Sequence, residues 1–93
     1  MILVWPSKDP DEVLDYEINW TARLAGDTIS SSEWVLPTAD AVDPLVLDSD
    51  NNDTTSATAW LSGGKLGKSY EITNRVVTAT GRTMDQIVVL NIK

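Results

Sequence analysis

Two strands joined by a tight turn dominate the last third of the chain, from Lys68 to Lys93, and constrain the fold more than any other stretch. In the first strand, apolar side chains recur at alternate positions, at Tyr70, Ile72 and Val76. In the second strand they form a dense run over residues 87–92. Asn74 is the polar exception on the first face, and Gly81 can adopt the positive φ that a short hairpin loop requires. Because an isolated hairpin is only marginally stable in water, the upstream chain must cover this apolar face.

The upstream sequence predicts further short strands separated by turn signals. Leu14 to Trp20 alternates most clearly between apolar and polar residues. The other predicted strands are 28–36, 45–47 and 56–61, with a connector at 22–27, a helical turn as an alternative at 38–42, and an acidic loop at 48–55. Six or seven strands without a helix of normal length predict an all-β, two-sheet antiparallel sandwich. The spacing Tyr-x-Ile-x-x-x-Val from Tyr70 is similar to the penultimate strand of immunoglobulin and fibronectin type III domains, so we expect a sandwich of that type.

The composition excludes several classes of site. The 93 residues suffice for one domain and include no Cys and no His, which removes disulfides, thiol nucleophiles, the commonest general base and the commonest transition-metal ligand. Carboxylate pairs such as Asp15 and Glu17, and the serines at 30–32, form no pattern that selects a catalytic site. We therefore expect no enzyme activity and no cofactor. Without a membrane span or signal peptide, we expect a soluble protein made in the cytoplasm.

Charge is distributed unevenly along the chain, whose net charge is −7. Residues 1–53 hold 12 acids and 2 bases, whereas residues 54–93 hold 2 acids and 5 bases. Bases this few and scattered argue against binding to nucleic acid. The asymmetry either serves docking between unlike surfaces or is diluted by the interleaving of strands in the fold.

Asp48 to Asp53 begins like a calcium-binding loop, with oxygen ligands at alternate positions. The match fails at the sixth position, where Asp53 stands in place of glycine, and at the twelfth, where Ala59 stands in place of glutamate. We therefore expect a solvated turn and no metal site.

The chain has four tryptophans and no phenylalanine. Exposed tryptophan faces beside Asp or Asn could stack on sugars, whereas the lack of phenylalanine requires other aromatic residues to fill the core. Trp20 is in phase with the apolar face of its strand, so we expect it in the core, and we expect the same of Trp34 and Trp60. Trp5 is the tryptophan that we expect to be exposed or to face a partner.

The first 12 residues differ from the rest of the chain. Met1 to Trp5 is a short apolar run that could form an edge strand or an arm lying on a neighbour. Pro6 to Glu12 is polar, and its two prolines oppose a helix. We therefore divide the chain into an N-terminal arm, residues 1–12, and an immunoglobulin-like sandwich, residues 13–93.

Four ordered blocks carry a family resemblance, namely Lys8–Trp20, Arg23–Ile29, Trp60–Gly64 and Tyr70–Arg75. Through them, nearly the whole chain resembles a family of small tailed-phage virion proteins called fiber-tail adaptors or head-tail accessory proteins. The resemblance implies an immunoglobulin-like sandwich with a structural role and no catalytic residues. It also implies partners among tail, fibre or capsid subunits, in symmetric multiple copies. The segment Thr38–Asp53 departs from the family because it is longer and more acidic.

Within this resemblance, the N-terminal arm is the expected docking element. The predicted partner-binding residues are Trp5, Pro6, Lys8, Asp9 and Pro10. We expect the protein to link a fibre to the tail or head-tail region of a virion, after synthesis in the host cytoplasm. Two other roles stay open: a capsid decoration or head-fibre protein anchored by the same arm, and a carbohydrate-binding sandwich with an exposed aromatic residue.

Overall fold

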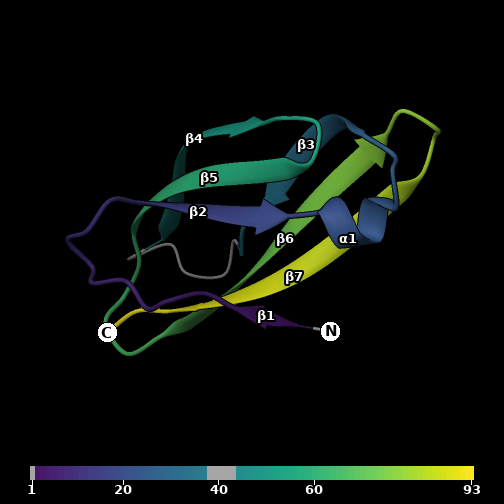
Figure 1. Cartoon of the computed structure of the whole chain (residues 1–93). Helices are drawn as coiled ribbons and strands as arrows, with labels where there is room; N and C mark the ends of the chain where they lie inside the picture. Colours follow the sequence, from purple (N-terminus) through teal and green to yellow (C-terminus); the bar gives the residue numbers. More distant parts are fainter. Residues whose placement is uncertain (1, 38–43) are drawn as a thin grey trace.

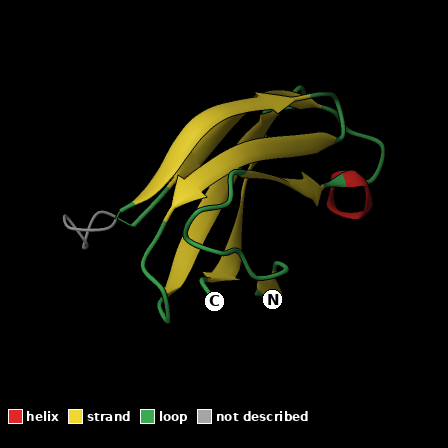
Figure 2. Cartoon of the chain, turned by 90° about the vertical axis from the view of Figure 1, so that its left-hand side faces the viewer, coloured by secondary structure: helices red, strands yellow, loops and turns green. Residues whose placement is uncertain are grey.

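The structure, a computed structural model, describes residues 2–37 and 44–93 as two β-sheets packed against each other (Figure 1). The elements of this described part are β1 (Leu3–Val4), β2 (Leu14–Asn19), α1 (Thr21–Leu24), β3 (Ile29–Val35), β4 (Leu45–Asn52), β5 (Ser56–Gly63), β6 (Ser69–Thr78) and β7 (Thr83–Asn91). One sheet has the order β1-β7-β6-β3 and the other has the order β2-β5-β4. In Figure 2, strands make up most of the chain and the short helix lies at one end of them. The all-β sandwich is therefore confirmed, and the immunoglobulin-like topology stays a prediction.

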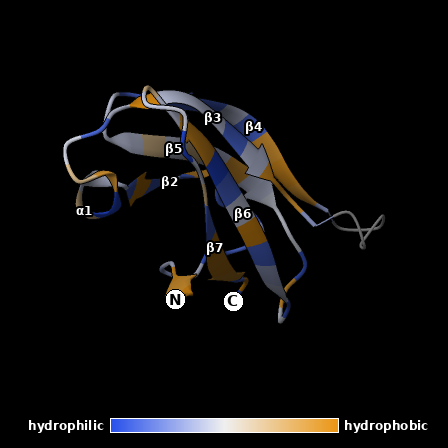
Figure 3. Ribbon diagram, turned by 90° about the vertical axis from the view of Figure 1, so that its right-hand side faces the viewer, coloured by the Kyte–Doolittle hydropathy of each residue, from blue (hydrophilic) through white to orange (hydrophobic). Residues whose placement is uncertain are grey.

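The predicted C-terminal hairpin is present as β6 and β7. The two strands pair antiparallel, from Ser69 opposite Asn91 to Val77 opposite Thr83. Gly81 in the connecting turn has a φ of 94°, which glycine adopts without the steric cost of a Cβ atom. The predicted inward residues of β6 are all buried, and hydrophobic and hydrophilic bands follow one another along the strand (Figure 3).

Asn74, the polar exception in this strand, is buried and its amide is fully hydrogen-bonded. Its Oδ1 accepts a hydrogen bond from Trp20 Nε1 at 2.9 Å. Its Nδ2 donates to Ser32 Oγ at 2.9 Å and to the carbonyl of Glu33 at 3.0 Å. Because Trp20 follows β2 in the other sheet, Asn74 ties the two sheets together while satisfying its own polar atoms.

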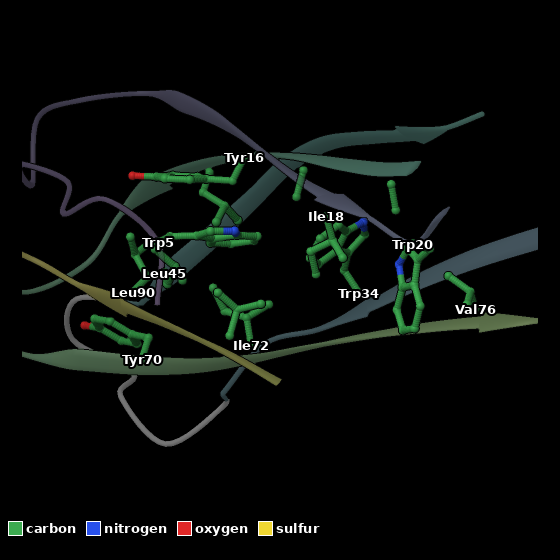
Figure 4. Packing of buried hydrophobic residues seen from close by; sticks show 14 of the residues in the cluster. Trp5, Tyr16, Ile18, Trp20, Trp34, Leu45, Tyr70, Ile72, Val76 and Leu90 are labelled. Atoms are coloured by element: carbon green, nitrogen blue, oxygen red, sulfur yellow. The ribbon is translucent and has the colours of Figure 1, made fainter. Parts of the chain in front are cut away.

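On the inner face of the three-stranded sheet, large side chains of β2 lie beside small side chains of β5. Tyr16 pairs with Ala59 and Ile18 pairs with Ala57, and both alanines are fully buried. The alanines leave room for the aromatic rings that fill the space between the sheets (Figure 4). The alternation predicted for residues 14–20 is confirmed.

Two of the four tryptophan predictions are confirmed and two are wrong. Trp20 and Trp34 are buried, as expected. The sequence predicts that Trp5 is exposed or faces a partner, and the structure contradicts the exposure, since only 8% of its surface is accessible. Its indole stacks on the Tyr16 ring inside the sandwich, with 4.7 Å between the ring centroids (Figure 4). Trp60 was expected in the core, but it is 39% exposed, because the alanines and Leu61 of β5 occupy the inward positions and leave Trp60 on the outer face.

The acidic loop predicted at 48–55 is also wrong over most of its length. Residues 48–52 continue β4, which pairs antiparallel with β5 up to Asn52 opposite Ala57. The register shifts between Leu47 and Ser49, so a bulge lies where the acidic segment begins. Backbone pairing with β5 thus overrides the low strand propensity of Asp and Asn. The alternative helical turn at 38–42 lies outside the described residues.

The N-terminal segment is attached to the four-stranded sheet. β1 pairs in parallel with β7, with Leu3 opposite Val88 and Val4 opposite Val89, so the predicted edge strand is confirmed. Farther along, Lys8 forms an isolated parallel bridge with Ile92. These contacts place residues 3–8 along the last strand of the chain.

Candidate docking surfaces

The N-terminal segment holds the five predicted partner-binding residues, and the structure divides them into two groups. Trp5 and Lys8 point into the protein, whereas Pro6 and Asp9 are exposed and Pro10 is half-buried. Trp5 is fixed from both ends, since its amide donates to the Val89 carbonyl at 3.0 Å and its ring stacks on Tyr16. Any contact of this segment with a partner therefore falls to its exposed residues.

Lys8 is the most unexpected of the buried residues, because only 1% of its surface is accessible. Its Nζ donates to the carbonyl of Gly63 at 2.7 Å and to that of Asp9 at 2.8 Å. Burial lowers the pKa of the Lys8 amino group, and the carboxylates of Glu12 and Asp9 oppose that shift. The amino group thus fastens the segment to the end of β5.

A tight turn follows at Asp9–Glu12 and fixes the exposed residues. The Asp9 amide donates to Glu12 Oε1 at 2.8 Å, and the Glu12 amide donates back to the Asp9 carbonyl at 3.0 Å. The Asp11 amide donates to Asp9 Oδ1 at 2.9 Å. With Pro10 fixing φ inside it, this turn presents three carboxylates in one arrangement and loses little entropy on binding. We refer to residues 6–12 as the N-terminal turn.

The outer face of the three-stranded sheet carries an exposed tryptophan. Trp60 lies on β5, the central strand, opposite Asp15 of β2 and Ser49 of β4. Glu17 is the next outward residue of β2 and lies opposite Thr58. We refer to the outward side chains of β2, β5 and β4 as the acidic face.

The acidic face keeps the charge asymmetry of the sequence. Its strands contain four acids, and none of their described residues is Lys or Arg. Asp15 and Glu17 point outward on β2, whereas Asp48 lies at the bulge of β4 and Asp50 lies opposite the inward residue Ala59. Interleaving of strands does not dilute the charge here, because the acid-rich segments β2 and β4 both pair with β5, which carries no charged residue.

The outer face of the four-stranded sheet is partly apolar. Four strands contribute exposed aliphatic side chains to it, namely Val4, Val35, Val77 and Ile87. Arg75 and Asp85 form an ion pair at 2.8 Å across β6 and β7 on the same face. We refer to the four aliphatic residues as the apolar face. The outward positions of the predicted strands are the sequence signal from which this face could have been predicted.

Asp53, the last residue of the segment that begins like a calcium-binding loop, caps the turn between β4 and β5. Its Oδ1 accepts from the amides of Thr55 and Ser56, both at 2.8 Å, and from Ser56 Oγ at 3.0 Å. These bonds, led by the one from the Thr55 amide, lower the pKa of Asp53. The carboxylate therefore closes the β4–β5 turn, and among the described residues no three His, Cys, Asp or Glu side chains gather as metal ligands.

A surface hollow near the tip of the β6–β7 hairpin is lined by residues 24–28, Thr80 and Arg82. Asp27 Oδ2 accepts from Thr80 Oγ1 at 2.6 Å and from Arg82 Nη2 at 3.1 Å. Arg82 Nη2 also donates to the Leu24 carbonyl at 2.6 Å. Hydrogen bonds, first of all the one from Thr80, hold the pKa of Asp27 well below its usual range. These groups pair with one another and fasten the hairpin tip to the β2–β3 connection.

The profile of the family described as podophage GP4 fiber-tail adaptor protein gp77 matches residues 8–91. The chain belongs to this family. No curated protein matches it. The match begins at buried Lys8 and includes the N-terminal turn from that residue onward, together with β2 to β7.

The name of the fiber-tail adaptor family describes a structural virion part of a bacteriophage. An adaptor is defined by what it joins, so its function lies in its outer surfaces rather than in an internal site. In the described part of this family member, no helix is long and apolar enough to cross a membrane. The N-terminal turn, the acidic face and the apolar face are the surfaces that it offers.

Proposed function

We propose that this chain is a non-enzymatic part of a tailed-phage virion that links a fibre to the tail or head-tail region through protein–protein contacts. The observation that carries the proposal is the unlike chemistry of its two outer faces. A linking protein has to hold two partners at once, and a sandwich has two opposite outer surfaces. One of them presents carboxylates around Trp60 and the other presents aliphatic side chains. Membership of the fiber-tail adaptor family supports the same role.

The N-terminal turn supplies a third contact in this proposal. Pro6, Asp9 and Pro10 touch a neighbouring subunit, while Trp5 and Lys8 hold the turn in place from inside the sandwich. A turn that is rigid before binding gives up little conformational entropy when it docks. Its support is the set of hydrogen bonds that the backbone amides of residues 9, 11 and 12 donate within the turn, and the two bonds from Lys8 Nζ.

Locating the chain in an intact virion by cryo-electron microscopy tests the proposed function. We expect symmetric copies between the tail and a fibre, with at least two surfaces of each copy covered by different proteins. Copies spread over the capsid lattice would overturn the adaptor role and make the chain a decoration or head-fibre protein. Copies at the tail that contact one protein only would contradict the linking role.

A further inference from the structure

We propose that the acidic face docks on a basic protein surface of a neighbouring virion subunit, with Trp60 as the central apolar contact. The inference rests on the proposed function and names the chemistry of one of its partners. Three observations carry it: the position of Trp60, the sign of the charge around it, and the exposure of β4.

Trp60 lies in the middle of the acidic face and has a larger side chain than the outward residues around it. Its strand is central in the three-stranded sheet, so neighbouring strands flank it on both sides. The nearest outward residues all have shorter side chains, namely Asp15 and Ser49 on the flanking strands and Thr58 and Ser62 on β5 itself. A large aromatic residue near the centre of a polar patch is the usual position of an interface hot spot.

The surrounding charge selects the chemistry of the partner. Arg and Lys side chains from a partner would meet the carboxylates of Asp15 and Glu17, and a guanidinium group could also stack on the indole of Trp60. Arg23 already lies over Trp20 in this way, 4.8 Å from the ring centroid. A nucleic acid, an anionic lipid surface or a second acidic face would be repelled, because like charges placed opposite each other at an interface disfavour association.

β4 extends the face beyond the body of the sandwich. Residues 48–52 are exposed at five consecutive positions, although they pair with β5, so both sides of this half of the strand face solvent. β4 is also an edge strand of its sheet. Asp50 lies opposite the inward residue Ala59, so it points to the other side of the sheet from Trp60. A partner on Trp60 reaches Asp50 only if it also covers the exposed edge of β4.

Zero-length cross-linking tests the contact in the assembled particle. Intact virions are treated with a water-soluble carbodiimide, which joins carboxylates to lysine amines in direct contact, and the products are mapped by mass spectrometry. We expect links from Asp15 or Glu17 to lysines of another virion protein. If this chain lies at the tail but links form only through Glu33 and Glu71 of the opposite sheet, the acidic-face proposal is overturned while the adaptor role stands.

Matched variants then measure the contribution of the face. Trp60→Ala should weaken binding to the cross-linked partner by on the order of 30-fold, the usual loss for a central aromatic contact. Asp15→Asn with Glu17→Gln should weaken it and reduce its salt dependence. Glu33→Gln with Glu71→Gln makes the same change in net charge on the opposite sheet and should leave binding unchanged. Equal effects of the two charge pairs in variants with unchanged melting temperatures would contradict a specific role of the acidic face.

A sugar titration separates the proposal from its main competitor. An exposed indole beside Asp15 could also stack on a sugar ring, so tryptophan emission is followed while glucose, galactose or N-acetylglucosamine is added. We expect no saturable change. A saturable change that disappears in Trp60→Ala would overturn the basic-partner proposal and identify the face as a carbohydrate site.

Discussion

Trp20 and Trp34 both have buried rings, but the hydrogen bonding of their indole Nε1 atoms differs. Trp20 Nε1 donates to Asn74, whereas Trp34 Nε1 has no hydrogen-bond partner in the described part of the chain. A buried donor without a partner costs free energy, and a buried acceptor that loses its donor costs a similar amount. The two indoles therefore contribute differently to stability at nearly the same burial.

Replacing each of these rings by phenylalanine should reveal that difference. Both changes remove similar volume, but Trp20→Phe leaves Asn74 Oδ1 unpaired, while Trp34→Phe removes an unpaired N–H group. We expect Trp20→Phe to lower the free energy of unfolding by about 1 to 3 kcal/mol more than Trp34→Phe does. Urea denaturation of the two variants measures this quantity; equal losses would show that the Trp20–Asn74 bond contributes nothing.

Acid should destabilise the fold through Asp27. Hydrogen bonds, led by that from Thr80, keep the folded-state pKa of Asp27 below its usual value. The unfolded chain therefore binds the proton first, at about pH 4, and stability is lost as pH falls further through the lowered folded-state pKa. Asp27→Asn should reduce the stability at pH 7 and flatten its decline between pH 5 and 2. Denaturant melts at several pH values check this; an unchanged slope would exclude Asp27 as a source of acid sensitivity.

At the scale of the elements, two glycines at strand ends and turns adopt backbone conformations that disfavour any larger residue. Gly81 in the β6–β7 turn has a φ of 94° and open space where a Cβ would lie. Gly63 at the end of β5 has a φ of 74°, and a Cβ there would lie 2.6 Å from the carbonyl oxygen of Pro44. We expect Gly81→Ala to cost roughly 1 to 3 kcal/mol from backbone strain alone. Gly63→Ala should cost more, because the Pro44 backbone must also move, and thermal unfolding that ranks the two in reverse would contradict this.

The N-terminal segment has an inner and an outer side, and variants can separate them. Trp5→Ala should lower stability by about 3 to 5 kcal/mol, because it empties a space beside Tyr16. Pro6→Arg changes an exposed residue and should leave the melting temperature close to that of the parent. If the N-terminal turn docks on a partner, Pro6→Arg should instead reduce incorporation into particles. Normal incorporation of a folded Pro6→Arg variant would count against the N-terminal turn as a partner contact. Deletion of residues 1–10 cannot test that contact, because the deletion also removes Trp5 from the core.

Some elements could be predicted from the sequence and others could not, for physical reasons. β2 and the β6–β7 hairpin alternate in polarity because one face of each strand is buried, so their phase is visible in the sequence. β4 was predicted only as far as Leu47, since its acidic half is held by backbone pairing with β5 rather than by side-chain burial. β1 has two residues, too few to show a period, so nothing local indicated that Trp5 would enter the core.

The docking surfaces were less accessible to prediction than the fold. The exposure of Trp60 follows from the alternation of β5, where Ala57, Ala59 and Leu61 share the inward phase, but the expectation that tryptophan fills a core outweighed that signal. Lys8 gave no signal at all, because its burial depends on a carbonyl of Gly63, 55 residues later in the chain. Contacts between distant segments cannot be seen in a local pattern.

At the scale of the whole molecule, the fold is an elongated block of 40 × 20 × 19 Å. Its two outer faces lie on opposite sides of the sandwich, and they differ in charge and polarity. A rigid block of this kind can hold two partners at a fixed separation, because sheet packing between Tyr16, Trp34 and their neighbours leaves little freedom for the faces to move. This rigidity matches the role proposed for it.

The pairing of the first strand with the last also determines when the protein can finish folding. β1 pairs with residues 88 and 89, and the backbone amide of the buried Trp5 donates to the Val89 carbonyl. On the ribosome, the N-terminal segment can therefore complete these contacts only after residues 88–91 have been synthesised, and contacts of such long sequence separation form slowly. The N-terminal turn is held in place by Lys8, whose backbone amide bonds to the Asn91 carbonyl, so an incomplete chain cannot present that turn. If the N-terminal turn docks on a partner, a product truncated before Asn91 would lack that contact.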